Sequence, residues 1–399
     1  MTKLEQLINE LCPNGVEYRT LNTICNVYDG THQTPQYTDS GIKFASVENI
    51  TDPYATEKYI SVSDYEKYKI KPQRNDLLMT RIGSIGVCTV IESDEPLAYY
   101  VSLALLRPDN SILNSRYLKY AIESLHCRKE LRKRTLVNAV PIKINMGDIG
   151  KITLPVPPLP VQSEIVRILD NFTELTAELT AELTARRQQY EYYNNILLSF
   201  DNAKYQTLEE LCDIVDYRGK TPRKVDDGIF LITAKNIRKG FIDYDKSKEY
   251  ISPEDYDEVM HRGFPKIGDV LITTEAPCGN VAQIDNENIA LAQRVIKYRP
   301  KSNKLNSTFL KYVLLGKEFQ DKLERAATGG TVKGIKGSKL HQLTIPVPSI
   351  EEQERIVAIL DRFDTLCNDL TSGLPAEIEA RQKQYEYYRD KLLKFKKSE

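Results

Sequence analysis

The sequence lacks several features that mark particular classes of protein. It contains no tryptophan, only four histidines and no run of about 18 apolar residues, and its mean hydropathy is negative, at -0.43. Without such a run, no membrane-spanning helix is expected. The seven cysteines lie far apart and form no Cys-x-x-Cys pair. We therefore expect neither a disulfide framework nor a zinc ribbon, and a reducing, cytoplasmic location.

The chain also lacks an excess of positive charge. Lysine and arginine number 55 against 56 acidic residues, which gives a net charge of -1. A protein that binds nucleic acid by itself is usually strongly basic. Any nucleic-acid binding must therefore rely on local basic patches or on a partner that neutralises phosphates. At 399 residues the chain is long enough for two or three domains.

The most informative feature that is present is an internal repeat. A Pro-Val-Pro segment and the nine residues Gln162–Asp170 recur at one constant offset as a second Pro-Val-Pro segment and Gln353–Asp361. The string Gln-Tyr-Glu-Tyr-Tyr begins at Gln189 and again at Gln384, where the offset is four residues larger. The period is too long for a solenoid, so we interpret the chain as a duplicated two-part module.

Each repeat ends in a predicted long helix. From about residue 162 to 200, apolar residues recur at i, i+3 and i+4 with no interrupting glycine or proline. A helix of that length reaches roughly 57 Å at about 1.5 Å per residue. The second repeat shows the same pattern, but Gly373 and Pro375 are expected to kink or restart its helix.

The segments before the helices contain short β-rich runs and helical patches, which predicts mixed units in an α+β fold. We expect a globular unit over 1–150, a spacer helix over 151–200, a second globular unit over 201–342 and a C-terminal spacer helix over 343–399. Two such helices can pack antiparallel, with the globular units related by a pseudo-twofold axis. The tetrapeptide Thr-Ala-Glu-Leu occurs twice, at Thr176 and Thr180. Each copy adds about 6 Å and roughly 40° of rotation, so the helix is expected to act as a ruler. A coiled coil that serves only assembly is the alternative.

With these motifs together, the chain resembles the specificity subunit of a Type I restriction-modification enzyme over essentially its whole length. The resemblance implies that each globular unit is a target recognition domain, which reads one half of an asymmetric bipartite DNA site. It implies that the helices set the spacer length and dock two methyltransferase subunits. S-adenosylmethionine and ATP are then expected on the methyltransferase and translocase-nuclease partners, and no cofactor or chemistry in this chain.

The sequence contains no complete catalytic motif of the kinds expected for these reactions. Asp52-Pro53-Tyr54 lacks the second proline of the Asn/Asp-Pro-Pro-Tyr/Phe loop of adenine methyltransferases, and a simple turn is expected there. The glycine-rich stretch from Gly329 has Ile335 where a phosphate-binding loop needs lysine. The histidines show no ligand spacing, so no metal is expected. Two alternatives stay open: a methyltransferase or nuclease with diverged motifs, and a helical scaffold that reads no DNA.

Candidate DNA contacts are basic, amide and hydroxyl side chains in the loops of both units. In the first unit they are Thr31, His32, Gln33, Thr34, Asn49, Arg81, Ser84 and Lys143. In the second they are Arg218, Lys220, Thr221, Arg223, Lys235, Asn236, Thr274, Lys333 and Lys336. Solvated turns with ordinary surface charge are the alternative. The basic run from Arg128 to Arg134 fits a DNA-backbone contact and a solvated helix face equally well.

Candidate contacts to partner subunits are the apolar residues of the long helices. These are Ile165, Ile168, Leu169, Phe172, Leu179, Leu183, Ile356, Ile359, Leu360, Phe363 and Leu370.

Overall fold

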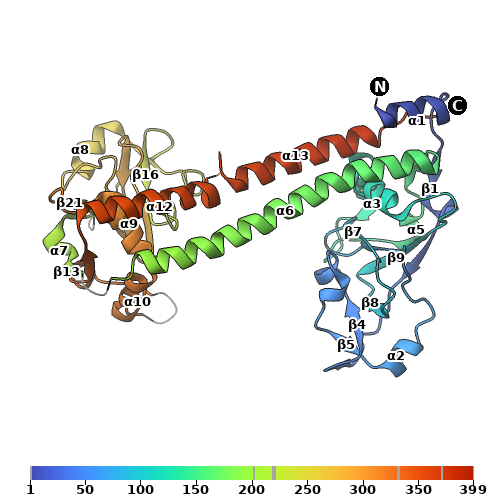
Figure 1. Ribbon diagram of the computed structural model, residues 1–399, viewed down its shortest axis with the longest axis horizontal. Helices are drawn as coiled ribbons and strands as arrows, with labels where there is room; N and C mark the ends of the chain where they lie inside the picture. The colour runs from blue at the N-terminus through green and yellow to red at the C-terminus, as the bar shows by residue number, and fades with distance from the viewer. Residues whose placement is uncertain (1, 201–202, 218–221, 330–332, 370–371, 399) are drawn as a thin grey trace. The chain divides into compact units, whose positions relative to one another are not determined.

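The computed structural model describes residues 2–200, 203–217, 222–329, 333–369 and 372–398 (Figure 1). The chain forms two compact units. The first comprises Met1–Thr180 with Glu377–Glu399, and the second comprises Ala181–Ala376. Within the described residues, no helix combines the length and the apolar character needed to cross a membrane.

The first unit is built on two four-stranded sheets. In one, the strand order is β2-β9-β6-β7 and all pairs are antiparallel: β2 (Cys25–Asp29), β9 (Leu103–Pro108), β6 (Leu77–Thr80) and β7 (Cys88–Val90). In the other, the order is β3-β5-β4-β8, with β4 and β8 parallel: β3 (Tyr37–Thr38), β5 (Tyr59–Ile60), β4 (Ile42–Ala45) and β8 (Leu97–Tyr99).

Short elements complete the first unit. Two small antiparallel sheets pair β1 (Tyr18–Thr20) with β12 (Thr153–Pro155) and β10 (Thr135–Leu136) with β11 (Lys143–Ile144). The helices are α1 (Lys3–Leu11), α2 (Val62–Glu66), α3 (Ser115–Glu123), α4 (Leu125–Arg134) and α5 (Met146–Ile149), with 3-10 turns at Leu21–Thr23, Val47–Asn49 and Pro53–Ala55.

The second unit repeats this plan. Its antiparallel sheet has the order β14-β21-β18-β19: β14 (Cys212–Asp216), β21 (Val295–Pro300), β18 (Val270–Thr274) and β19 (Cys278–Gln283). Its mixed sheet has the order β15-β17-β16-β20: β15 (Lys224–Val225), β17 (Tyr250–Ile251), β16 (Ile229–Ile232) and β20 (Ile289–Leu291). The remaining elements are β13 (Lys204–Thr207), paired with β22 (Thr344–Val347), α7 (Leu208–Leu211), a 3-10 turn at Pro253–Asp255, α8 (Tyr256–Val259), α9 (Ser307–Leu315), α10 (Lys317–Ala326) and α11 (Gly337–His341).

Strand β6 shows why these runs fold as buried strands. Leu77 and Met79 pack in the core that contains α3, whereas Leu78, between them, belongs to a separate core beneath the mixed sheet. Side chains alternate between the two faces of a strand, so one apolar run serves both cores. Each fully buried aliphatic side chain contributes about 1.5–3 kcal/mol. The mixed α+β units predicted from the sequence are confirmed.

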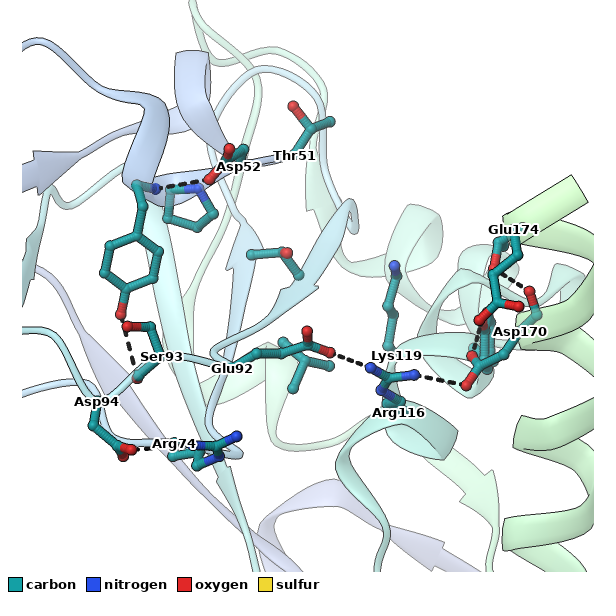
Figure 2. Close-up of a pocket in the computed structure, with 16 residues that line it drawn as sticks. Thr51, Asp52, Arg74, Glu92, Ser93, Asp94, Arg116, Lys119, Asp170 and Glu174 are labelled. Atoms are coloured by element: carbon teal, nitrogen blue, oxygen red, sulfur yellow. Dashed lines mark hydrogen bonds and ion pairs between the residues drawn. The ribbon is translucent and has the colours of Figure 1, made fainter. Parts of the chain in front are cut away.

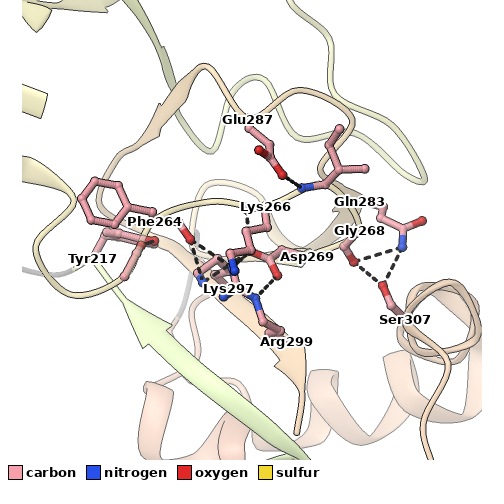
Figure 3. A network of polar contacts seen from close by, with 12 residues as sticks. Tyr217, Phe264, Lys266, Gly268, Asp269, Gln283, Glu287, Lys297, Arg299 and Ser307 are labelled. Carbon is pink, nitrogen blue, oxygen red and sulfur yellow. Dashed lines mark hydrogen bonds and ion pairs between the residues drawn. The ribbon is translucent and has the colours of Figure 1, made fainter. Parts of the chain in front are cut away.

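An ion pair with a buried carboxylate recurs next to both antiparallel sheets. Arg107 donates two hydrogen bonds to Asp76, of 2.9 and 2.7 Å, and Arg299 donates two to Asp269, both of 2.6 Å. Both carboxylates are almost fully buried. In the second unit Lys297 joins the pair, 3.3 Å from Asp269 (Figure 3). Burial lowers the pKa of Lys297.

The first long helix, α6 (Leu159–Leu197), has 39 residues and contributes to both units. It begins about three residues earlier than the pattern predicts. Pro160 is tolerated in the first turn, because the backbone N–H groups there have no intrahelical acceptor and the missing N–H of proline costs no hydrogen bond. The second repeat has two helices, α12 (Ile350–Asn368) and α13 (Leu374–Leu392). The predicted restart near Gly373 and Pro375 is confirmed.

Aromatic pairs hold the long helices together. Phe172 of α6 stacks on Tyr388 of α13 at 5.4 Å in the first unit, and Tyr193 of α6 stacks on Phe363 of α12 at 5.6 Å in the second. Phe172 and Phe363 are equivalent in the repeat, as are Tyr193 and Tyr388. Each repeat therefore gives its phenylalanine to one unit and its tyrosine to the other.

The second unit fixes the direction of this packing. Arg187, one and a half turns before Tyr193, donates to the carbonyl of Cys367, four residues beyond Phe363. As the residue number on α6 increases from 187 to 193, the residue number of the partner on α12 decreases from 367 to 363. The two helices are therefore antiparallel, as predicted.

One glutamine in each repeat anchors the long helix to its globular unit. The buried Gln162 accepts from the backbone N–H of Asn114, at 2.8 Å, and donates to the carbonyls of Ile112 and Pro157, at 2.8 and 2.7 Å. Gln353 makes the same three bonds to Asn306, Lys304 and Pro348. The glutamine that opens the repeated sequence motif is thus a structural clamp.

Candidate nucleic-acid interface

Arg81 joins three loops of the first unit. It directly follows β6, and its guanidinium donates to Asp29 at 2.8 Å, to the carbonyl of Val101 at 3.1 Å and to that of Ile144 at 3.3 Å. Asp29 ends β2 and leads into the loop of Thr31 to Thr34, while Ile144 follows Lys143. The loop of Thr31 to Thr34, the segment of Arg81 and Ser84, and Lys143 therefore lie together.

Asp29 fixes the start of the first loop. One carboxylate oxygen accepts the N–H of Gly30 at 3.0 Å, and the other lies 2.9 Å from Nε2 of His32. His32, Gln33 and Thr34 are exposed at this loop, and Thr31 is half-buried. These side chains are accessible to a ligand on a loop with a fixed base.

Arg81 itself is buried and its donors face groups of its own chain. Arg81 was expected to contact a base directly, and this expectation is corrected. Its guanidinium is engaged by Asp29 and two backbone carbonyls, so it positions the loops. Ser84 and Lys143 are exposed beside it. Asn49 is half-buried, and its amide oxygen is buried with no hydrogen-bond partner in the described structure.

In the second unit the loop after β18 meets the segment that carries Lys333 and Lys336. Ile335 donates its N–H to the carbonyl of Thr274 at 3.0 Å, and Glu275 forms a backbone bridge with Gly334. Lys333 and Lys336 are both exposed, and Lys333 contacts Glu324 at 2.5 Å. Two of the candidate groups of this unit are thus brought together.

The other candidates of the second unit differ in their surroundings. Arg223 and Lys235 are exposed. Thr274 is buried, so its side chain is corrected from a DNA contact to part of the framework. Arg218, Lys220 and Thr221 lie outside the described residues.

Asn236 is corrected as well. It is fully buried, accepts from the backbone N–H and the hydroxyl of Thr233, at 3.0 and 2.8 Å, and donates to the carbonyls of Asp243 and Ser247, at 3.0 and 2.9 Å. All four hydrogen bonds of its side-chain amide are made within the turn, so none is available to a base.

The helix residues divide by exposure. Four of the candidate partner contacts are fully buried in the core of their own unit, which corrects their assignment to a partner: Ile165, Leu169, Ile356 and Leu360. The half-buried candidates are Ile168, Phe172, Leu179, Leu183, Ile359 and Phe363. Leu370 lies outside the described residues. Tyr192 and Tyr387, equivalent in the repeat and absent from the candidates, are 62% and 60% exposed on the long helices.

The first unit also contains a cleft of about 800 Å³ with many charged side chains (Figure 2). Arg116 lies between Glu92 and Asp170, 2.7 Å from the latter, and Arg74 contacts Asp94 at 3.1 Å. These ion pairs involve five of the eight charged side chains that line the cleft. Asp52 lines it too and caps the 3-10 turn by accepting the N–H of Tyr54 at 3.1 Å, so the predicted turn is confirmed. In the described part of the chain, no group of three or more His, Cys, Asp or Glu side chains could hold a metal ion.

Comparison with known protein families gives two matches along the chain. The family model described as the type I restriction modification DNA specificity domain matches residues 13–186 and again 201–380.

Individual relatives agree with it. The specificity subunit of the type I restriction enzyme EcoR124I/EcoR124II of Escherichia coli is 41% identical over 275 residues, which are 62% of this chain and 64% of that protein. A protein of Haemophilus influenzae named as a type I restriction enzyme specificity subunit is 33% identical, over 71% of this chain and 73% of its own length. A crystal structure of a type I restriction-modification S subunit from M. genitalium has a TM-score of 0.55 at 15% identity, over 95% of this chain and 96% of that one, and shows the same fold.

Proposed function

The chain belongs to the family of type I restriction-modification specificity subunits, which are not catalytic, and on that premise we propose that it reads an asymmetric, two-part DNA site for a modification and restriction complex. The first unit reads one half-site and the second reads the other. The polypeptide supplies recognition, and other subunits supply the chemistry.

One observation carries this proposal. The two units repeat the same sheets, ion pair and glutamine clamp, yet the loops at the edge after β6 and after β18 differ in sequence. A constant framework that presents dissimilar exposed side chains at equivalent places suits two readers of different base sequences. In the first unit these readers are the exposed residues of the 31–34 loop with Ser84 and Lys143. In the second they are Arg223, Lys235, Lys333 and Lys336, together with Arg218, Lys220 and Thr221.

The near-neutral charge supports a requirement for partners. We expect two methyltransferase subunits, with S-adenosylmethionine, to dock on the long helices and supply much of the contact to DNA phosphates. ATP belongs on the translocase-nuclease subunits. The exposed tyrosines Tyr192 and Tyr387 are suited to such docking, because tyrosine combines apolar area with a polar tip.

The Thr-Ala-Glu-Leu copies in α6 are proposed to set the spacer between the half-sites. Deleting Thr180 to Leu183 removes about 6 Å of helix and about 40° of rotation. Both half-sites are expected to stay the same, and only the gap between them to change.

Mapping of methylated adenines in cells with and without this chain tests the proposal. A bipartite motif that appears only with the chain is expected. Exchange of residues 14–150 for those of a relative should then alter one half-site and leave the other. Absence of a new motif, while the chain still binds methyltransferase subunits, would favour the scaffold alternative. Methyl transfer by the purified chain alone would favour the enzyme alternative.

A further inference from the structure

The first unit exposes a hairpin, formed by β10 and β11, whose apolar residues are not among the proposed readers. Strands β10 and β11 pair antiparallel, with Thr135 opposite Ile144, and the segment between them forms the tip. Four aliphatic side chains of this hairpin are exposed: Leu136, Val137, Val140 and Ile142. Val137 is 63% exposed and Val140 is 100% exposed. A single exposed aliphatic residue is ordinary, but four within seven residues form a patch of the kind that contacts a ligand.

The base of the hairpin is held firmly. Ile144 is fully buried, and its N–H donates to the carbonyl of Arg81 at 3.0 Å. The N–H of Gly83 donates to the carbonyl of Ile142 at 2.9 Å. The hairpin is therefore hydrogen-bonded to the loop that carries Ser84. Its base is held in place, and its tip is exposed.

Positive charge flanks the tip on both sides. The last turn of α4 contains Arg132, Lys133 and Arg134 directly before the hairpin, and Lys143 is exposed on the returning strand. Glu130 pairs with Lys133 at 3.2 Å and Arg134 at 2.7 Å. Arg132 and Lys143 are both exposed, one before and one after the apolar residues.

This combination fits duplex DNA. A two-stranded β-ribbon is narrow enough for the major groove, where an aliphatic side chain can contact the methyl group of thymine. Flanking cations suit the phosphates on either side of a groove.

We propose that the tip of the β10–β11 hairpin enters a groove of the DNA at the half-site read by the first unit, with Val137 and Val140 against base edges. This inference rests on the proposed function. The equivalent stretch of the second unit, Thr328 to Gly334, is rich in glycine and contains one valine. The apolar contact is therefore specific to the first half-site.

Photo-crosslinking identifies the occupant directly. Val140→p-benzoylphenylalanine is introduced into the full chain, assembled with its methyltransferase subunits and irradiated on DNA that carries the mapped site. We expect a crosslink to the DNA at the first half-site. The same substitution at Ser84 is the positive control, and at Val62, 57% exposed on α2, the negative control.

The outcomes separate the two proposals. A crosslink from position 84 to DNA without one from position 140 overturns the hairpin contact and leaves the proposed function standing. A crosslink from position 140 to a methyltransferase subunit makes the hairpin a protein interface and overturns the inference. An assembly that protects no specific DNA overturns the proposed function and the inference with it.

A titration then tests the chemistry of the contact. The double variant Val137→Ser/Val140→Ser is expected to weaken DNA binding about tenfold, with an unchanged slope against salt concentration, because apolar contacts release no counterions. Lys143→Ala should lower that slope by about one, and Val62→Ser should change neither quantity. Unchanged affinity in the double variant would contradict the proposal.

Discussion

Arg81, directly after β6 in the first unit, and Thr274, the last residue of β18 in the second, occupy equivalent places in the repeat. The backbone carbonyl of each accepts a hydrogen bond of 3.0 Å from an isoleucine of the neighbouring segment. Only Arg81 adds a side-chain clamp, to Asp29 and two carbonyls. The backbone junction is common to both units, whereas the side chains around it differ. A duplicated protein can therefore change what one unit presents without rebuilding the framework that both share.

The largest expected difference between the units concerns the buried aspartates. Asp269→Asn leaves both Arg299 and the buried Lys297 without their carboxylate, whereas Asp76→Asn leaves Arg107 alone. Breaking a buried ion pair costs about 3–5 kcal/mol. We expect both variants to be destabilised, and Asp269→Asn more strongly, in urea unfolding followed by circular dichroism.

The exposed pair of Asp94 with Arg74 provides the control. Asp94→Asn should change stability by less than about 1 kcal/mol, since surface ion pairs contribute little. A larger loss of stability from Asp76→Asn than from Asp269→Asn would show that the contact of Lys297 with Asp269 adds no stability to the folded second unit.

The next largest effect is expected from the loop clamp. Arg81→Ala removes the partner of Asp29 and of two carbonyls, which we expect to cost about 2–3 kcal/mol in stability. Methylation at the first half-site should fall at least tenfold, while discrimination at the second half-site stays unchanged. Thr274→Ala, the matched change in the other unit, should change stability by less than about 1 kcal/mol and should leave methylation at both half-sites nearly unchanged. Equal loss at both half-sites in Arg81→Ala would show general destabilisation and would refute local positioning.

The framework was predictable because repetition exposes it. The repeat places Asp76 at the position of Asp269 and Arg107 at the position of Arg299, but the sequence does not show that each aspartate pairs with an arginine. The burial of Arg81 could not be predicted. Two of its acceptors are backbone carbonyls, which every residue type has, so the sequence does not indicate them. Asn236 resembled a base reader for the same reason.

The helices illustrate a second limit. Apolar spacing identified the buried face of α6, including Ile165 and Leu169, but the pattern is the same whether that face packs on its own unit or on another subunit. The exposed Tyr192 and Tyr387 lie in the repeated Gln-Tyr-Glu-Tyr-Tyr string. Repetition marked the string without showing which of its tyrosines faces outward.

Where the two units have the same contacts, they should respond alike. Gln162→Leu and Gln353→Leu each remove three hydrogen bonds and leave a buried N–H and two carbonyls. Each variant is expected to lose about 2 kcal/mol in urea unfolding, and the two losses should agree within about 0.5 kcal/mol. Ser163→Ala, the exposed neighbour, is the control. Unequal losses would show that the helix is anchored differently in the two units.

The smallest expected difference is a pH effect confined to the first unit. Hydrogen bonding to Arg167, assisted by Lys3, holds the pKa of Glu164 at about 2, against an ordinary value of 4.5, whereas the equivalent residue of the second unit is Arg355. A carboxylate whose pKa is lowered by folding stabilises the protein above its unfolded pKa, and this contribution disappears as the pH falls through the folded pKa. The wild type should therefore melt at a higher temperature than Glu164→Gln at pH 7, with the gap closing between about pH 4.5 and pH 2. Arg355→Gln should show a much smaller gap, since its exposed pair with Glu352 is screened by solvent. A gap for Glu164→Gln that stayed constant down to pH 2 would mean that the carboxylate acts through packing and not through its charge.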